Sequence, residues 1–197
     1  MKHLDARSHG LRPFSIYQGR WSAALRDFER DIIPMCEAEG MALAPWGALG
    51  GGNFKSDAQR AENDGRQMRR SNADIEVIVS RALEKIATRK QTLITSVALA
   101  YVMHKAPYVF PIVGGRKVEH LKGNIEALSL KLSEGDIKEI ESAVSFDVGF
   151  PHNLLGGGPD PGRIAFDKVF LNHLSGHFDV VPPVKVSGHF NPQLFHN

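Results

Sequence analysis

The sequence predicts an α/β fold built from parallel β/α units. Three short apolar runs, at 14–18, 41–46 and 109–113, have the residue types of buried strands. Each run ends in small or polar residues, and segments with apolar residues at helical spacing follow. Strands that alternate with helices form parallel sheets, in which ligands bind at the carboxyl ends of the strands. We therefore expect a functional site at one edge of the sheet.

The first unit opens with the last turns of a helix in residues 1–12, which Gly10 closes as a C-cap. A run of strand formers comes next. Apolar residues at helical spacing then predict a helix over 24–39, which ends at Gly40. Because proline cannot donate a backbone hydrogen bond, Pro34 predicts a kink or break near the middle of this helix.

The second strand, 41–46, runs directly into the glycine-rich segment 47–52. Residues 53–71 are polar and rich in charge, without sustained periodicity. We interpret them as a surface loop or mobile excursion.

Two helices follow this loop. The first is predicted over 73–89, with Ser71 or Asn72 as its cap. The second is predicted over about 92–105, and Pro107 stops it.

The third strand ends in Gly114 and Gly115, and Arg116 and Lys117 follow at the start of a helix predicted over 117–129. A strand, a glycine turn and a helix together offer free backbone N–H groups to an anion. The helix macrodipole disfavours cations at that end, unless a phosphate lies between them and the helix. Two interpretations stay open: a phosphate-binding loop, or a connecting loop whose cations face water.

A last amphipathic helix is predicted near 134–144, with Ser133 as its cap. After residue 145 the pattern weakens, and the tetrapeptide Ser-Gly-His-Phe occurs twice without forming a longer repeat. We expect a domain over 1–150 and a tail over 151–197 that packs on it or trails from it.

The composition excludes several classes of protein. The 197 residues are 42% hydrophobic and 23% charged, as in a globular domain. A net charge of +2, with acids among the bases, gives no reason to expect nucleic acid as a partner. No apolar run is long enough for a membrane span, and the N-terminus lacks the apolar region of a signal peptide. We expect a soluble, cytoplasmic protein.

Other candidate sites are weak. Cys36, the single cysteine, lies on an apolar helical face and fits packing better than nucleophilic chemistry. His173 and His177 have the spacing of helical metal ligands, but Gly176 and the lack of a partner carboxylate argue against a metal. We expect no metal site.

Five blocks of the sequence, spread over about residues 8–151, resemble the aldo-keto reductase superfamily and within it the fungal aryl-alcohol dehydrogenase and norsolorinic-acid-reductase-like branch. The blocks are Pro13-Phe14-Ser15-Ile16-Tyr17-Gln18-Gly19-Arg20-Trp21, the run 26–35, Met41-Ala42-Leu43-Ala44-Pro45-Trp46, the run 110–121 with 124–128, and Phe146-Asp147-Val148-Gly149-Phe150-Pro151. Any one block alone would be unspecific, but the set is specific.

The resemblance implies a (β/α)8 barrel that transfers hydride between NADP(H) and a carbonyl or alcohol. Gln18 matches the glutamine that holds the nicotinamide carboxamide, and Trp46 matches the aromatic ring that stacks on the nicotinamide. The pyrophosphate side would be the loop formed by Gly47, Ala48, Leu49 and Gly50. The family's usual Ser-Pro-Leu reads Gly-Ala-Leu here, so backbone amides would replace a serine hydroxyl.

The same resemblance places the adenosine end of the cofactor on the third unit, near Gly114. Arg116 matches a position that contacts the adenosine 2′-phosphate, and His120 and Asn124 match positions near the adenine. Gly123 stands where many relatives have an acidic residue, so one adenine contact is lost. A 2′-phosphate would explain cations at a helix N-terminus, which favours NADP(H) over NAD(H).

By resemblance, the chain holds only strands six to eight of the barrel, and the catalytic tetrad Asp, Tyr, Lys and His belongs to earlier strands. Tyr17, Tyr101 and Tyr108 match no tetrad position, so we assign no catalytic residue. Three strands cannot close a barrel, and they leave edges and apolar faces exposed. The chain is a truncation, a part that pairs with another chain, or an open three-stranded layer; truncation is favoured.

Lys55 or Arg66 in the charged loop could also touch the pyrophosphate.

Two functions follow. The first is an NADP-dependent oxidoreductase of aryl alcohols, aryl aldehydes or polyketide carbonyls in secondary metabolism, incomplete and inactive as this chain alone. The second is a non-catalytic remnant that binds nucleotide or a partner chain through the same edge.

Overall fold

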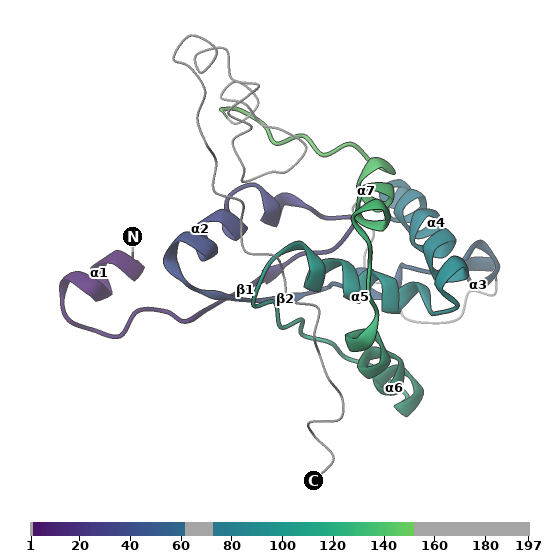
Figure 1. Ribbon diagram of the computed structural model, residues 1–197, viewed down its shortest axis with the longest axis horizontal. Helices are drawn as coiled ribbons and strands as arrows, with labels where there is room; N and C mark the ends of the chain where they lie inside the picture. The colour runs from purple at the N-terminus through teal and green to yellow at the C-terminus, as the bar shows by residue number, and fades with distance from the viewer. Residues whose placement is uncertain (1, 62–72, 152–197) are drawn as a thin grey trace.

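The computed structural model describes residues 2–61 and 73–151 (Figure 1). In chain order its elements are α1 Lys2–Ser8, β1 Ile16–Arg20, η1 Asp27–Glu29, α2 Ile32–Glu39, β2 Ala42–Trp46, η2 Gly50–Gly52, α3 Asp57–Ala61, α4 Ala73–Lys90, α5 Ile94–Lys105, α6 Val118–Glu126, η3 Ala127–Ser129 and α7 Glu134–Ser142. The predicted alternation of strands and helices is confirmed, and the molecule is α/β.

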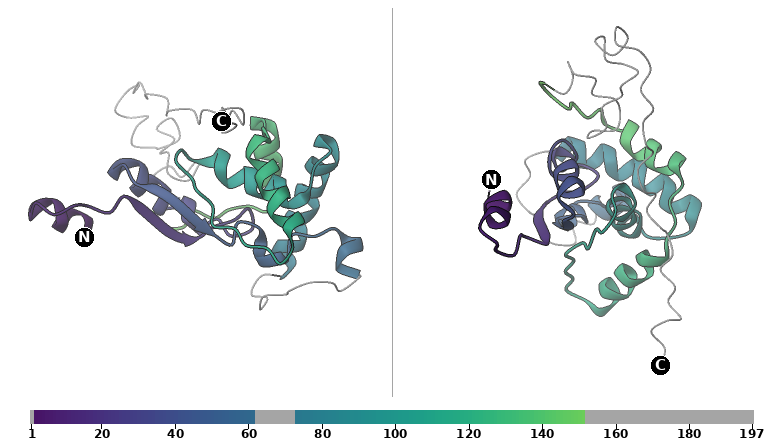
Figure 2. Two further views of the ribbon diagram at one scale, coloured as in Figure 1. Left: turned by 90° about the horizontal axis from the view of Figure 1, so that it is seen from below. Right: turned by 60° about the vertical axis from the view of Figure 1, so that its left-hand side comes forward.

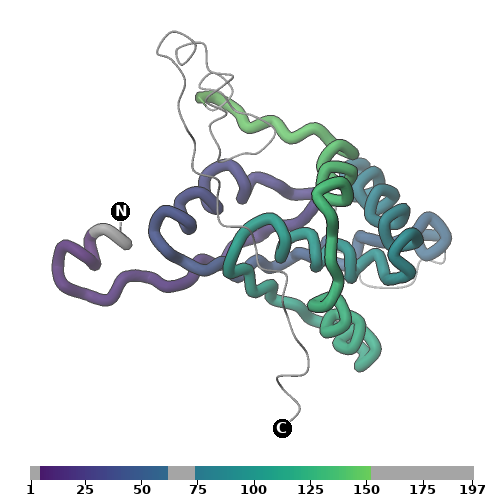
Figure 3. The backbone as a smooth tube through the Cα atoms, in the orientation of Figure 1, coloured from purple at the N-terminus to yellow at the C-terminus, as the bar shows by residue number. Residues whose placement is uncertain are grey.

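The sheet is parallel, as expected. Strand β1 pairs with β2 in a register that sets Gln18 beside Ala44 and Arg20 beside Trp46. Between them the chain returns through α2, as the tube in Figure 3 shows. The third predicted strand, 109–113, lies on the other side of β2 and joins it through two parallel bridges, Leu43–Val109 and Trp46–Ile112.

That third strand is not a continuous ladder, which corrects the expectation of a regular strand. Phe110 N–H donates to the Leu43 carbonyl and Ile112 N–H to the Pro45 carbonyl, both at 2.8 Å. Pro45 has no N–H to donate in return, so the pairing is interrupted between the two bridges.

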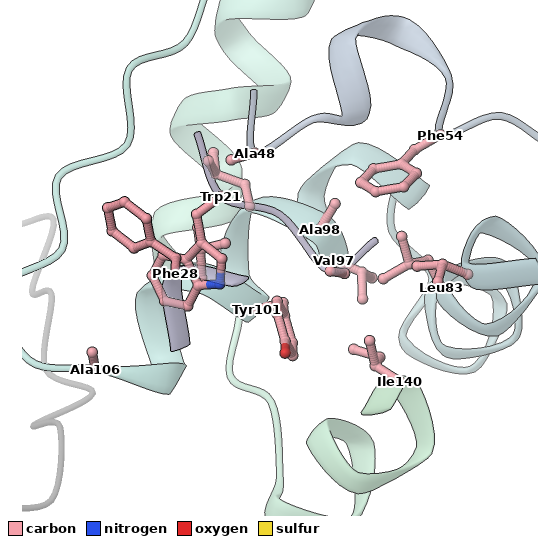
Figure 4. Close-up of a cluster of buried hydrophobic side chains, with 14 of the residues drawn as sticks. Trp21, Phe28, Ala48, Phe54, Leu83, Val97, Ala98, Tyr101, Ala106 and Ile140 are labelled. Atoms are coloured by element: carbon pink, nitrogen blue, oxygen red, sulfur yellow. The ribbon is translucent and has the colours of Figure 1, made fainter. Parts of the chain in front are cut away.

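One face of the sheet packs against helices. Tyr17, Leu43 and Val109 alternate onto this face and lie in or against the hydrophobic core, which also contains side chains of α2, α4, α5 and α7. Figure 2 shows how these helices lie around the strands. Helix α5 is buried from Ser96 to Val102 and forms the centre of the core. Figure 4 shows how Trp21, Phe28, Tyr101 and Ile140 gather there.

The opposite face of the sheet carries no helix among the described residues. The register places side chains of all three strands on it: Ile16, Gln18, Trp46, Phe110 and Ile112, which we call the open sheet face. The exposed fractions of its apolar members are 48% for Ile16, 43% for Trp46, 59% for Phe110 and 46% for Ile112. Exposed apolar faces were expected for three strands, and the described residues have them.

The predicted helix over 24–39 is two pieces. The 3₁₀ turn η1 ends at Glu29, and α2 begins at Ile32. Pro34 is the third residue of α2, within the first turn, where a backbone N–H has no partner inside the helix. The expected break therefore lies before Pro34, not around it. Gly40 ends the helix as predicted, with φ of 65°.

Helices α4, α5 and α7 confirm their predictions, and α6 continues into η3 over the range predicted as one helix. Ser133 caps α7 in a capping box: its hydroxyl accepts from the Asp136 amide while the Asp136 carboxylate accepts from the Ser133 amide. Helix α3 lies within the segment predicted as a loop, 53–71. Ser71, Asn72 and the tail beyond Pro151 lie outside the described residues.

The segment after α7 is tied to the start of α2. Arg30 donates to the carbonyls of Val148 and Asp147, at 2.7 and 2.9 Å. The Phe146 ring lies 5.3 Å from the Arg30 guanidinium carbon. Within residues 2–61 and 73–151, no helix is long and apolar enough to cross a membrane.

Candidate functional site

The carboxyl ends of β1 and β2 bring Gln18 and Trp46 to the same face and edge of the sheet. Because Arg20 pairs with Trp46, Gln18 lies two residues back on the neighbouring strand with its side chain on the same side. Gln18 is exposed, and the Trp46 ring is exposed by 43%. A planar ligand can therefore approach the indole ring from the open sheet face.

A cation that the sequence did not single out lies beside this ring. The guanidinium carbon of Arg20 is 5.9 Å from the centre of the Trp46 ring, a cation–π geometry. A Cβ on Gly47 would stand 3.4 Å from the Arg20 side chain. The sequence did contain a signal for Arg20, because it lies two residues after Gln18 and residues two apart in a strand share a face.

The loop after β2 offers its backbone more than its side chains. Gly47 and Gly50 have φ of 77° and 67°, which favours glycine at both positions. Ala48 is buried to 1% exposure and Leu49 packs against the core, so neither side chain is presented to a ligand. Within the described residues the amides of Ala48 and Leu49 donate no hydrogen bond, whereas the Gly50 amide is used inside the turn. That backbone amides of this loop, in place of a serine hydroxyl, contact a pyrophosphate stays a prediction.

The third strand delivers Gly114 and Arg116 next to this edge. Trp46 bridges to Ile112, and Gly114 follows two residues later, exposed and with open space around it. Gly115 is the more constrained glycine, because a Cβ there would lie 2.8 Å from the His120 Cβ. Arg116 is exposed.

Helix α6 begins just beyond these residues. Lys117 occupies its N-cap in an extended conformation, without a side-chain cap. The His120 amide donates to the Lys117 carbonyl at 3.2 Å, whereas no described residue accepts from the amides of Val118 and Glu119, which can therefore face an anion. His120 is exposed in this first turn. Asn124 is only 9% exposed, one turn further along, and its side chain is largely withdrawn from solvent. Of the residues assigned to the adenine by resemblance, His120 is the accessible one.

A second group of largely buried polar side chains joins η1, α5 and α7, and sequence reasoning missed it. We call it the Glu29 cluster; its members are Trp21, Arg26, Glu29, Tyr101, Lys105 and Glu141. Glu29 accepts from the Tyr101 hydroxyl at 2.9 Å and from Arg26 at 2.8 Å. Lys105 pairs with Glu141 at 2.6 Å.

A tyrosine beside a lysine and carboxylates can act as a proton donor when substrate reaches it. Tyr101 is 0% exposed, which excludes such contact. Burial, followed by the charge of Glu29, raises the pKa of Tyr101 well above its usual value. The Glu29 cluster therefore joins η1, α5 and α7 and is structural. Cys36 is also buried, and burial together with the nearby Glu37 charge raises the pKa of its thiol. A buried, protonated thiol fits a packing role better than a nucleophilic one.

The structure describes few of the remaining candidate residues, which are the histidine pair and the charged residues of the loop after β2. The described residues contain no group of three or more side chains suited to a metal. His173, His177 and Arg66 lie outside the described residues. Lys55 is partly buried in the loop before α3.

Comparisons with known proteins find relatives that all belong to one family. The model of the aldo/keto reductase family matches residues 1–145. Norsolorinic acid reductase A of Aspergillus parasiticus is 60% identical over 150 residues, which is 76% of this chain and 38% of that protein. An aryl-alcohol dehydrogenase of Pestalotiopsis microspora is 52% identical over 184 residues, 93% of this chain and 47% of that protein.

Solved structures agree on the fold. A thermostable aldo-keto reductase in complex with the inhibitor epalrestat has a TM-score of 0.53 and 26% identity, over 72% of this chain and 44% of its own. An aldo/keto reductase from Klebsiella pneumoniae in complex with NADP and acetate has a TM-score of 0.52 and 17% identity, over 65% and 38%. The chain spans about half the length, or less, of the relatives named here. With its parallel β/α units and the family match over most of its length, this chain belongs to the aldo/keto reductase family.

Proposed function

We propose that this chain binds NADP(H) and is part of an oxidoreductase that interconverts a carbonyl and an alcohol, with aryl aldehydes or polyketide carbonyls as substrates in the cytoplasm. The observation that carries the proposal is the meeting of an exposed amide, Gln18, and an exposed indole, Trp46, at the carboxyl edge of a parallel sheet. The similarity to norsolorinic acid reductases and aryl-alcohol dehydrogenases supports the substrate class.

Each part of this edge has a role suited to its chemistry. The Gln18 amide can both donate to and accept from a carboxamide, and the Trp46 face can stack on a flat ring. The bound nicotinamide supplies or accepts the hydride. The Gly47–Gly50 loop, with the amides of Ala48 and Leu49, would face the pyrophosphate, and Gly114 lets the chain pass closely beside the adenosine.

The preference for NADP(H) over NAD(H) rests on Arg116. Its guanidinium is exposed just before an uncapped helix N-terminus, so a 2′-phosphate could accept hydrogen bonds from both the side chain and the helix amides. His120 would lie near the adenine, with Asn124 contributing less because it is nearly buried.

We further propose that the three strands correspond to strands six to eight of an eight-stranded barrel, within a domain over 1–150 and followed by a tail over 151–197. The chain alone would then lack the catalytic tetrad, and activity would need the remaining strands, from the same protein or from another chain.

One observation keeps a second candidate, a nucleotide-binding remnant without catalysis, beside a reductase whose catalytic residues lie on other strands. All three tyrosines of the chain lie in the described residues, and none is at the candidate edge. Tyr17 faces the helical layer against Phe28, and Tyr101 is fully buried. Tyr108 lies at the amino end of its strand, opposite the candidate site. None of them can protonate a carbonyl bound beside Trp46.

Titration with NADPH tests nucleotide binding, because the two tryptophans differ in exposure. Trp21 is fully buried, whereas Trp46 is exposed by 43%. We expect NADPH to quench the emission of Trp46, and Trp46→Phe to remove the quenching. Trp46→Ala should weaken binding about tenfold through the lost stacking, measured by the fluorescence of the nucleotide itself. Quenching that persists in Trp46→Phe would place the nucleotide elsewhere.

A further inference from the structure

Arg20 is an exposed cation at the same edge of the sheet as Gln18 and Trp46. The register pairs Arg20 with Trp46, and Arg20 lies two residues after Gln18, so all three side chains share one face. The Arg20 guanidinium carbon is 5.9 Å from the centre of the Trp46 ring. A Cβ on Gly47 would stand 3.4 Å from Arg20 Cγ, so the arginine stem lies beside the start of the loop after β2. The charge is therefore held next to the indole.

This charge has no counter-ion among residues 2–61 and 73–151. Most arginines in these ranges form an ion pair with a carboxylate, namely Arg7, Arg26, Arg30, Arg60, Arg81 and Arg89. Within the same ranges no carboxylate pairs with Arg20, and its contact is with the Trp46 ring. An uncompensated positive charge acts on whatever binds at that ring.

The strand order decides which part of a bound dinucleotide meets this charge. Strand β1 lies on one side of β2, and the strand 109–113 lies on the other. The residues that resemblance assigns to the adenosine end, Gly114 and Arg116, follow the strand 109–113. Arg20 is therefore separated from the adenosine end by Trp46, and its charge acts on the nicotinamide half of the cofactor.

The two redox states of nicotinamide differ in charge, because the oxidised ring is a pyridinium cation and the reduced ring is neutral. An indole face attracts cations, so Trp46 alone would favour the oxidised ring. The Arg20 guanidinium opposes this preference in two ways. It already interacts with the same indole, and it repels a second positive charge nearby.

We propose that Arg20 determines which redox state of the cofactor this edge prefers, so that NADPH binds more tightly than NADP⁺. The proposal rests on the proposed function, which places the nicotinamide on Trp46. Arg20 is then a specificity-determining residue that acts on the nicotinamide ring through its charge. At equal concentrations of the two forms the site would hold mostly the reduced one, which suits reduction of a carbonyl.

Coulomb's law sets the size of the expected effect. Two unit charges about 8 Å apart, at an effective dielectric constant of about 40, repel enough to change a dissociation constant about fivefold. The phosphates and the adenosine are identical in NADPH and NADP⁺, so their contacts cancel in the ratio of the two dissociation constants. This ratio therefore isolates the charge at the nicotinamide ring.

The experiment measures both dissociation constants on the 197-residue chain. NADPH is titrated by its own fluorescence, and NADP⁺ is measured by its displacement of bound NADPH. We expect the constant for NADP⁺ to exceed that for NADPH, and Arg20→Gln to lower their ratio about fivefold. Arg20→Lys keeps the charge and should keep most of the ratio.

The matched control is Arg12→Gln. Arg12 is another exposed arginine, four residues before β1 begins, so this variant changes the net charge equally but away from the candidate edge. It should leave the ratio unchanged. Both positions are exposed, so each variant should keep its fold, which circular dichroism and thermal unfolding check.

A ratio that Arg20→Gln leaves unchanged would overturn the proposal. If both affinities fell equally in that variant, Arg20 would instead contact a phosphate. The same change of ratio in Arg12→Gln would reduce the effect to net charge and would also overturn the proposal. Failure of the wild-type chain to bind NADPH would overturn the proposed function as well, whereas bound NADPH with an unchanged ratio would overturn this proposal alone.

Discussion

At the scale of single residues, the candidate site depends on exposed side chains that no other part of the described structure explains. Trp46 is an apolar ring left 43% exposed at a strand end, next to the cation of Arg20. Arg116 stands exposed before a helix whose dipole disfavours it. Both are understandable if an aromatic and anionic ligand lies between them, and each can be tested separately.

Arg116→Ala should lower the affinity for NADPH about tenfold or more and leave NADH nearly unchanged, because a bidentate contact to the 2′-phosphate is lost. The ratio of the two affinities, measured by titration, is the readout. Lys122→Ala removes another exposed cation of α6 and serves as the control. An unchanged ratio in the Arg116 variant would show that the 2′-phosphate lies elsewhere.

Glu29→Gln should destabilise the fold strongly. The carboxylate is 1% exposed and accepts from Trp21, Arg26 and Tyr101. Removing its charge leaves a buried guanidinium without its main partner, at a cost of about 3 kcal/mol. Urea unfolding measures the loss, with Glu37→Gln on the exposed side of α2 as the control. A loss no larger than that of the control would mean that Glu141 alone neutralises Arg26.

At the scale of elements, α7 is held by its first turn. Asp136 closes the capping box with Ser133 and forms ion pairs with Arg89 and Lys90, at 2.5 and 3.0 Å. Burial alone would raise the pKa of this carboxyl. The hydrogen bonds from Ser133, Lys90 and Arg89 outweigh burial and hold the pKa well below its usual range.

A carboxyl whose pKa is lower in the folded state stabilises the fold above its unfolded pKa, and this contribution is lost as pH falls. The loss should begin near the ordinary aspartate pKa of 3.8 and continue below it. Asp136→Asn should cost about 1 to 2 kcal/mol at neutral pH through the lost cap and ion pairs. The variant should also show a smaller decrease in stability below pH 4 in urea unfolding. Parallel pH profiles would contradict this assignment.

The elements differ in how far the sequence could predict them. Helix α7 has an amphipathic pattern and a local start signal in Ser133, and α4 is also amphipathic, so both were predicted closely. Helix α5 is apolar on nearly all sides and was located by its apolar residues and by Pro107 beyond its end. The break before Pro34 was misplaced because proline is tolerated in a first turn as well as at a kink. The interruption of the third strand could not be predicted from its own residues, because the missing hydrogen-bond donor belongs to Pro45 on the neighbouring strand.

The candidate site was also predictable only where it depends on local sequence features. Strand ends and glycine loops are local features, so the edge that holds Gln18, Trp46 and Gly114 could be anticipated. The Glu29 cluster could not, because Tyr101 contacts Glu29 across 72 residues. The near burial of Asn124 also depends on tertiary packing, which the helical pattern alone does not contain.

At the scale of the whole molecule, the described fold has one covered and one uncovered side of its sheet. The helical layer, the Glu29 cluster and the contact of Arg30 with Val148 complete the covered side. The uncovered side holds the nucleotide edge, with Trp46 exposed on it.

The purified chain alone should not turn over an aryl aldehyde such as veratraldehyde with NADPH, because no tyrosine lies at the candidate edge to protonate the carbonyl. Loss of NADPH absorbance with time is the measurement. Turnover should appear only when the remaining strands of the barrel are supplied with this chain. Activity of the isolated chain would show that the missing strands are not needed for catalysis.

Pro111 gives the free edge of the third strand a property that bears on misfolding. Its nitrogen points away from β2, at the middle of that edge, where any other residue would offer a donor to an incoming strand. A strand from an unfolded or identical chain could bond to the amides of Val109 and Val113, but not between them. The edge is thus a poor template for amyloid-like growth.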